Sequence, residues 1–178
     1  MTFGQSSEHL TFKGVPIDGT LDDFVSNMEK SGFSHLGTNK GSAVLEGDFA
    51  TYKGCQIYVS TLNQIDLVNL IGVIFPKKDT WSNVLGDYTF LKKLLSEKYG
   101  EPGNVVEEFR NGDPSSDFLK VIKIGQQEGT YRCVWELDKG SIVLSIIPSD
   151  SKRECSSLLV YSDKINADKV KEKALDDL

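Results

Sequence analysis

The sequence predicts one mixed α+β domain in which two helix-led units share a single antiparallel sheet. The chain has 178 residues, a length that one hydrophobic core can serve. The spacing of apolar residues changes twice from helical to alternating, and turn-forming residues separate the alternating runs. We therefore expect one domain over residues 1–178, with structural repeats over residues 10–76 and 80–162 and a C-terminal helix over residues 163–178.

The first unit is predicted to begin with a helix directly after Thr20. This hydroxyl can cap the first turn, and Asp23 lies three residues further on, where a capping-box carboxylate is expected. Apolar residues then recur at helical spacing until Gly32, which is a natural stop: Leu21, Phe24, Val25 and Met28.

Three antiparallel strands are predicted between Ala43 and Phe75. The turns between them are expected at Tyr52–Gly54 and at Thr61–Gln64. The third strand, within residues 65–75, is apolar on both faces and should therefore be the most central.

The second unit is predicted to begin with a helix from Thr80 to Gly100. Its broad apolar face comprises Trp81, Val84, Leu85, Tyr88, Leu91 and Leu95. Gly86 lies inside this helix at a cost of about 1 kcal/mol relative to Ala, so we expect a packing neighbour that needs the space. Strands are predicted next, with a hairpin turn at Asp138–Gly140, over residues 105–109, 118–124, 131–137, 142–147 and 157–161. A surface helix is expected from Asn166.

The charge balance disfavours two classes of partner. The chain has 20 Lys and Arg residues against 26 Asp and Glu residues, which gives a formal charge of −6. Nucleic acids and anionic membranes attract basic surfaces, so neither is expected as a partner. No apolar stretch approaches the roughly 20 residues of a spanning helix, so no transmembrane segment is predicted.

No metal or cofactor site is predicted. Cys55, Cys133 and Cys155 do not have the spacing of metal ligands, and we expect buried thiols on strands. One disulfide between two of them is left open. Residues 111–117 depart from the pattern of a calcium loop, and no glycine-rich phosphate loop occurs.

No catalytic residue is predicted either. His9 and His35 are the two histidines of the chain, and we expect each to be an ordinary solvated or capping side chain. Adjacent carboxylates such as Glu107 and Glu108 point to opposite faces of a strand and cannot act together. The alternative is a divergent hydrolase whose site is built from carboxylates that are distant in sequence.

Aromatic residues on strands and turns are the candidate partner-binding residues: Tyr52, Tyr58, Trp135 and Tyr161. Trp135 alternates with Cys133 and Leu137, which favours a core position for it. Tyr58 alternates with polar neighbours, which favours an outward position.

Two stretches resemble uncharacterised exported proteins of Bacteroides-type bacteria: His9–Thr20 (HLTFKGVPIDGT) and Tyr131–Leu137 (YRCVWEL). The tandem layout is also similar to the β-lactamase inhibitor protein fold. That resemblance implies one curved sheet with helices on one face, and members of that fold bind other proteins through the sheet.

The absence of a catalytic, metal or cofactor signature and the tandem layout together favour a non-enzymatic envelope or secreted protein that binds another protein or a small ligand with the open face of its sheet. The polar run Gln5–Glu8 is typical of the start of a mature exported chain, so a periplasmic or secreted location with the leader removed is expected. A cytoplasmic location is left open.

Overall fold

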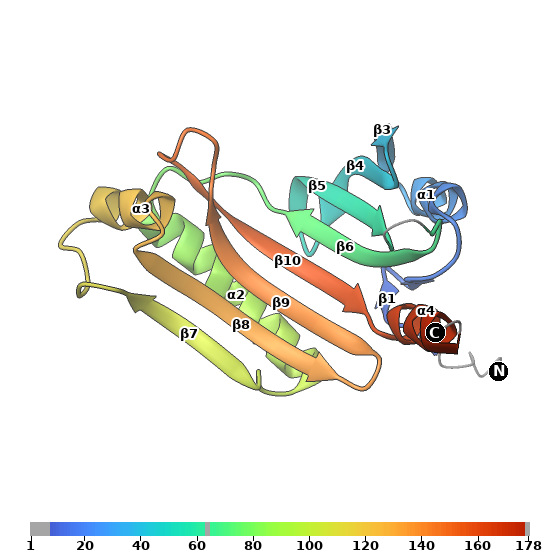
Figure 1. Cartoon of the computed structure of the whole chain (residues 1–178). Coiled ribbons are helices and arrows are strands. Elements are labelled where there is room, and N and C mark those ends of the chain that lie inside the picture. The colour runs from blue at the N-terminus through green and yellow to red at the C-terminus, as the bar shows by residue number, and fades with distance from the viewer. Residues whose placement is uncertain (1–7, 63–64, 177–178) are drawn as a thin grey trace.

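An eight-stranded antiparallel sheet forms the body of the computed structural model, which describes residues 8–62 and 65–176 (Figure 1). Its strands are β3 (Ser34–Asn39), β4 (Ser42–Phe49), β5 (Tyr52–Thr61), β6 (Val68–Ile74), β7 (Asn104–Phe109), β8 (Gly129–Leu137), β9 (Gly140–Pro148) and β10 (Cys155–Asp163). They lie in the order β3-β4-β5-β6-β10-β9-β8-β7. A two-stranded sheet of β1 (Thr11–Phe12) and β2 (Val15–Pro16) lies beside it. The predicted α+β class is confirmed.

The two halves of the chain meet at the centre of the sheet, where β6 pairs with β10. The first half consists of α1 (Leu21–Lys30) followed by β3 to β6. The second consists of α2 (Trp81–Tyr99) followed by β7 to β10, with α3 (Asp117–Gly125) inserted after β7. The central place predicted for the third strand of the first unit is thereby confirmed for β6. That the two halves are structural repeats, and that the sheet is curved, stay predictions.

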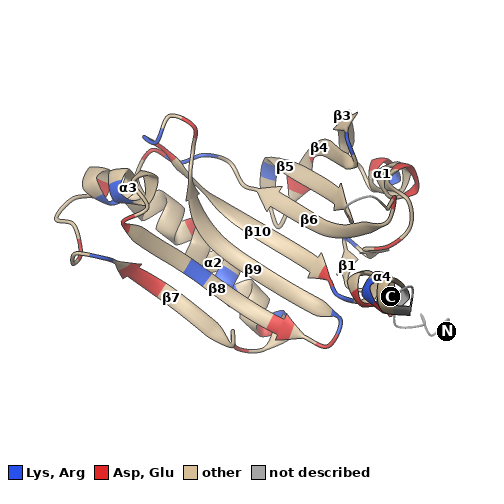
Figure 2. Ribbon diagram, in the orientation of Figure 1, with Lys and Arg blue, Asp and Glu red and all other residues tan. Residues whose placement is uncertain are grey.

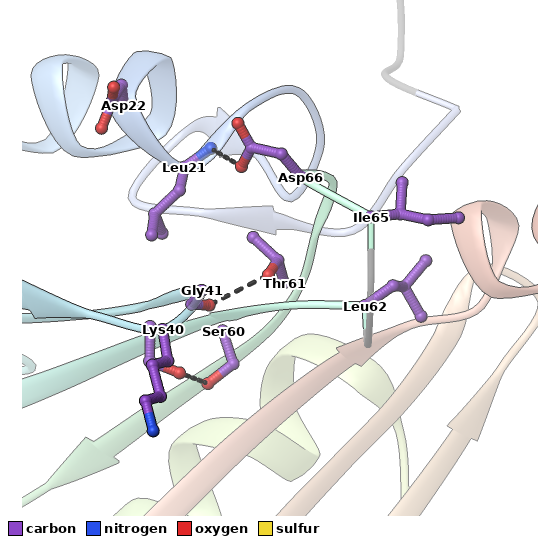
Figure 3. A pocket seen from close by; sticks show the side chains of 10 residues that line it. Leu21, Asp22, Lys40, Gly41, Ser60, Thr61, Leu62, Ile65 and Asp66 are labelled. Carbon is purple, nitrogen blue, oxygen red and sulfur yellow. Dashed lines mark hydrogen bonds between the residues drawn. The ribbon is translucent and has the colours of Figure 1, made fainter.

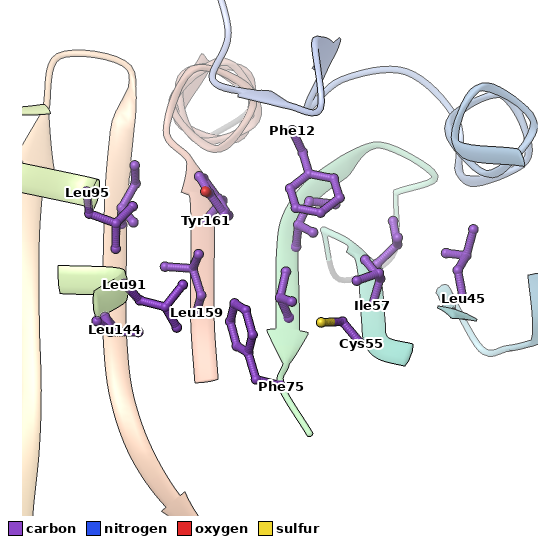
Figure 4. Packing of buried hydrophobic residues seen from close by; sticks show 14 of the residues in the cluster. Phe12, Leu45, Cys55, Ile57, Phe75, Leu91, Leu95, Leu144, Leu159 and Tyr161 are labelled. Carbon is purple, nitrogen blue, oxygen red and sulfur yellow. The ribbon is translucent and has the colours of Figure 1, made fainter. Parts of the chain in front are cut away.

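The hydrophobic core lies between one face of the sheet and the helices α1, α2 and α3. The predicted cap of α1 is present, since the amide of Asp23 donates to the Thr20 hydroxyl at 3.2 Å. Side chains from both halves converge in one cluster, in which Phe75 directly follows β6 and Leu159 lies on β10 (Figure 4). The fourth helix, α4 (Ile165–Asp176), begins just past the end of β10 and lies beside β1 (Figure 1).

The strand predicted over residues 118–124 is wrong, because these residues form α3. Their high content of Val, Ile and Phe favoured a strand. The Ser116 hydroxyl, however, caps a helix by accepting from the amide of Leu119 at 3.3 Å. Val121 and Ile124, three residues apart, are buried, which is the spacing of a helix face.

In the first unit the turn predicted at Tyr52–Gly54 is wrong, and one strand lies outside the predicted ones. Tyr52 begins β5, and the turn before it is made by Ala50 and Thr51, whose φ angles are 48° and 74°. Strand β3 was not predicted, because all six of its residues are exposed and no apolar alternation marks it. Part of the turn predicted at Thr61–Gln64 lies outside the described residues, and Thr61 itself ends β5.

Gly86 has no packing neighbour, so that expectation is wrong. A Cβ built at this position meets nothing within 4 Å, and the residue is exposed in the middle of α2. The helix therefore bears the entropic cost of this glycine with no compensating contact among the described residues.

We predict that Gly86→Ala raises the free energy of unfolding by about 0.5–1 kcal/mol, because Ala restricts the unfolded chain and fits the helix. Urea unfolding followed by circular dichroism measures the change. Gly129→Ala is the matched control and should lower stability, since its Cβ would lie 2.6 Å from Cδ1 of Phe109. A loss of stability in Gly86→Ala would contradict the explanation.

Candidate functional site

The sheet face opposite α1, α2 and α3, named here the open face, has no charged residue at the positions where β5, β6, β10 and β9 pair with one another. Residues on each strand alternate between the two faces, and those of the open face are the neighbours of the core residues. They are Gln56, Tyr58 and Ser60 on β5, Leu70, Gly72 and Ile74 on β6, Ser156, Leu158, Val160 and Ser162 on β10, and Ser141, Val143, Ser145 and Ile147 on β9. Charged residues make up 26% of the whole chain, so this region is distinctly neutral. In Figure 2 the ribbons of β6, β9 and β10 are correspondingly almost free of charge.

An apolar row crosses the middle of the open face. Direct pairing across six strands places side by side Val44, Tyr58, Gly72, Val160, Val143 and Val134. We name this row the apolar stripe. Tyr58 is 37% exposed, Val44, Val143 and Val160 are half-buried, and Gly72 and Val134 are buried by their neighbours. Apolar surface that no helix covers is the usual mark of an interaction site.

Charges appear on the open face only towards its two sides, among the strands β4 to β8. The register row next to the apolar stripe runs from Arg132 on β8 through Ser145, Leu158, Ile74 and Gln56 to Glu46 on β4. Opposite charges therefore stand at opposite ends of one row. Glu136 on β8 lies in the row on the other side of the stripe, paired with Ser141.

The structure places only one of the four candidate aromatic residues on the open face. Tyr58 lies there, and its hydroxyl donates to Gln56 at 3.1 Å. Trp135 and Tyr161 are buried in the core, where the Trp135 indole donates to the Gly100 carbonyl at 2.8 Å. Tyr52 is half-buried, and its hydroxyl donates to Asp87 at 3.0 Å. Tyr58 is thus the candidate that offers contact area to a partner.

The aliphatic members of the apolar stripe were not singled out from the sequence. A signal for them exists, because β6 and β10 are apolar on both faces although only one face lies under helices. Leu70 and Ile74 alternate with the buried Ile71 and Val73. For β6 this pattern predicts a central place in the sheet, which is correct, but a central place does not explain why its second face is apolar.

His9 contradicts its prediction as a solvated side chain, because it is buried at the end of the sheet with a relative exposure of 8%. Its Nδ1 lies 3.1 Å from Oδ1 of Asp163, and its Nε2 lies 3.5 Å from Oδ2 of Asp18. Asp163 also accepts from the amides of Leu10 at 3.0 Å and Asn166 at 3.2 Å. Two carboxylates distant in sequence thus converge on one imidazole.

This cluster ties together the two ends of the described chain. Asn166 on α4 donates to Asp18 at 2.8 Å and to the carbonyl of Val68 at 3.2 Å. Burial opposes ionisation of Asp18, but hydrogen bonds from Asn166 and Gly19 outweigh it and hold its pKa below the usual range. Both nitrogens of His9 face carboxylates, so the geometry serves cross-linking rather than proton exchange with a substrate.

A second polar cluster joins α2 to the edge strand β7. Glu107 accepts from Lys92 at 2.7 Å and from the Tyr88 hydroxyl at 3.0 Å. The Tyr88 oxygen also lies 2.9 Å from the sulfur of Cys133. Burial raises the pKa of the Cys133 thiol, and it raises those of Cys55 and Cys155 to about 11. All three cysteines are free, buried thiols, as expected for strand residues.

An open cleft of about 580 Å³ lies at the N-terminus of α1 (Figure 3). Its polar groups are largely satisfied by one another. Asp66 accepts from the amide of Leu21 at 2.9 Å, and the Thr61 hydroxyl donates to the carbonyl of Gly41 at 3.0 Å. These bonds fix the helix start and the neighbouring hairpin, so they have a structural explanation.

A scan against protein-family models found no match for this chain, and searches of curated proteins and of solved structures found none either. The resemblances to exported proteins and to the β-lactamase inhibitor fold therefore stay predictions. Within residues 8–62 and 65–176, no group of three or more His, Cys, Asp or Glu residues could hold a metal ion. No helix in the same residues is long and apolar enough to cross a membrane.

We predict that Asp163→Ala lowers the free energy of unfolding by about 3 kcal/mol, because it leaves two buried amides and His9 without their acceptor. Chemical unfolding monitored by tryptophan fluorescence measures this change. Asp150→Ala, at an exposed turn position, is the control and should leave stability within about 0.5 kcal/mol. Equal effects of the two variants would show that the buried cluster is not structural.

The stability contributed by Glu107 should depend on pH. Burial raises its pKa, but the hydrogen bonds from Lys92 and Tyr88 outweigh burial and the net pKa is lowered. A carboxyl whose folded pKa lies below its unfolded value stabilises the fold above the unfolded pKa, near 4.3, and loses that contribution as the pH falls through the folded pKa.

We therefore expect Glu107→Gln to cost about 0.5–1 kcal/mol at pH 7, a value that allows for the partial exposure of the pair. The difference from the parent protein should shrink as the pH falls below about 4. Urea unfolding across a pH series measures it, with Glu108→Gln, on the opposite face of the same strand, as the control. A difference that stays constant down to pH 3 would contradict this account.

Proposed function

We propose that this chain is a non-enzymatic binding protein of the cell envelope or the extracellular space, and that it holds another protein on its open face. The observation that supports this most strongly is the apolar stripe, which crosses six strands without a covering helix. The core on the other face already satisfies the hydrophobic requirement of folding. A second apolar face adds nothing to the core, but it gains free energy when a partner removes it from water.

The dimensions of the stripe favour a protein over a small molecule. Five strand spacings separate β4 from β8, which corresponds to roughly 24 Å. Small ligands are usually enclosed in concave pockets, whereas a broad sheet face suits an extended contact. Serine hydroxyls flank the stripe, and they can form hydrogen bonds with a partner without the cost of burying a charge.

The envelope or extracellular location rests on the resemblance of His9–Thr20 to exported proteins. The buried thiols are compatible with it, since inaccessible cysteines resist oxidation in any compartment.

Site-specific photo-crosslinking in the native cells tests this function. A photoreactive phenylalanine analogue replaces Tyr58 or Val143 on the open face, and Leu94 on α2 serves as the control. Leu94 and Tyr58 are each 37% exposed, so their accessibility is matched. We expect protein adducts from the two open-face positions, in the periplasmic or secreted fraction, and none from Leu94.

Purification of the captured protein then completes the test. Its affinity should fall at least tenfold for Ser145→Glu, which places a charge next to the stripe without disturbing the core, a cost of about 1.4 kcal/mol or more. Adducts that form equally at Leu94, or an affinity unaffected by Ser145→Glu, would overturn the proposal. Adducts confined to the cytosolic fraction would overturn the location.

A further inference from the structure

We infer that a second copy of this chain occupies the open face, so that two sheets pack face to face in a symmetric dimer. This inference rests on the proposed function, because it assigns a partner to the same surface. The inference follows from how charge and side-chain size are distributed along the register rows of the open face. When a second copy is related to the first by a two-fold rotation, the two distributions are complementary.

The relevant axis runs parallel to the strands, midway between the two sheets and in line with the gap between β6 and β10. Packed sheets lie about 10 Å apart with their strands nearly aligned. This rotation lays β8 over the partner's β4, β9 over its β5 and β10 over its β6, because these strands are equally far from the centre of the sheet. Residues of one register row then face the same row of the other copy.

The charged ends of one row become two ion pairs in this arrangement. Arg132 on β8 and Glu46 on β4 stand in one row, each third from the central gap. Rotation places Arg132 against the partner's Glu46, and symmetry repeats the pair at the other side of the interface. Between these pairs, Leu158 faces the partner's Ile74, an apolar match.

The apolar stripe matches itself in the same way. Val134 faces the partner's Val44, Val143 faces its Tyr58, and Val160 faces its Gly72. Gly72 provides no side chain, which leaves room for the valine opposite it.

The third row is compatible as well. It brings Glu136 against the partner's Ser42 and Ser141 against its Ser60. None of these rows brings like charges together between β4 and β8. An isologous interface requires this self-complementarity. Residue i of one copy contacts residue j of the other, and residue j of the first copy contacts residue i of the second.

Charge reversal and rescue test the inference. Sedimentation velocity of the purified chain over a wide concentration range should show a monomer–dimer equilibrium. Arg132→Glu and Glu46→Arg should each weaken dimerisation about tenfold or more, because each replaces two ion pairs by two like-charge contacts. The double variant should restore the affinity of the parent protein to within a few-fold.

Lys93→Glu provides the control, since Lys93 is 75% exposed on α2, on the helix side of the sheet, and its reversal should leave dimerisation unchanged. A chain that stays monomeric at every concentration would overturn the inference. So would a double variant that remains as weak as the single ones, or rescue of Arg132→Glu by Glu136→Arg rather than by Glu46→Arg, which would indicate a different axis.

These results separate the inference from the function on which it rests. A monomeric chain that still gives foreign adducts at Tyr58 refutes the dimer and leaves the binding function standing. A chain that gives neither a dimer nor open-face adducts refutes both.

Discussion

The pairing of β6 with β10 is the contact on which the arrangement of the whole molecule depends. It comprises five residue pairs, from Leu70–Ser162 to Ile74–Leu158, and it joins strands that are far apart in sequence. Because side chains alternate with a period of two, this register decides which residues of both halves face the core. Ile71 and Tyr161 meet on the helix side, while Gly72 and Val160 meet on the open face. A slip of one residue would exchange the two sets, so the core and the apolar stripe are fixed by the same bonds.

The end of β10 extends this constraint to both ends of the described chain. Asp163, the last residue of the strand, binds His9 and the amide of Leu10 on one side and accepts from the amide of Asn166, in the first turn of α4, on the other. A buried carboxylate is costly unless every lone pair is used, so this cluster permits few alternative positions for the segments it joins. Residues 9–12 are thereby fixed against the central strands, and the Phe12 ring makes an edge-to-face contact with the Tyr161 ring, with 5.7 Å between the ring centroids.

Local chemistry made α1, α2, α4 and most of the strands predictable, and long-range contacts explain part of what was missed. The Thr20 cap and the apolar spacing of α1 lie within a few residues of one another, so the sequence alone suffices for them. The role of His9 depends on Asp163, which lies 154 residues away in sequence. No local sequence pattern predicts that contact. The strand prediction for residues 118–124 was wrong for another reason. Their β-branched and aromatic composition favours a strand, whereas in the structure the Ser116 cap starts a helix. The alternation of polar residues around Tyr58 correctly predicts that it faces outward. The residues that lie beside it in the sheet, however, can be identified only once the strand order is known.

The neutrality of the open face is the property that folding does not account for. The helices cover one face of the sheet, and a monomer would gain solubility from charges on the other, as most surfaces do. Strands β5, β6, β10 and β9 instead present serine and aliphatic residues there, and the charges stand further out on β4 and β8. Serine hydroxyls form hydrogen bonds with water while the face is free. Because no Lys or Glu has to be desolvated there, the free-energy cost of removing that water on binding is low. A reversible protein contact requires a surface that is hydrated in the free protein but costs little free energy to desolvate on binding. The placement of Arg132 and Glu46 at equal distances from the β6–β10 pair then restricts which partner fits. A register row that is neutral in the middle and oppositely charged at its two ends is complementary to its own rotated image.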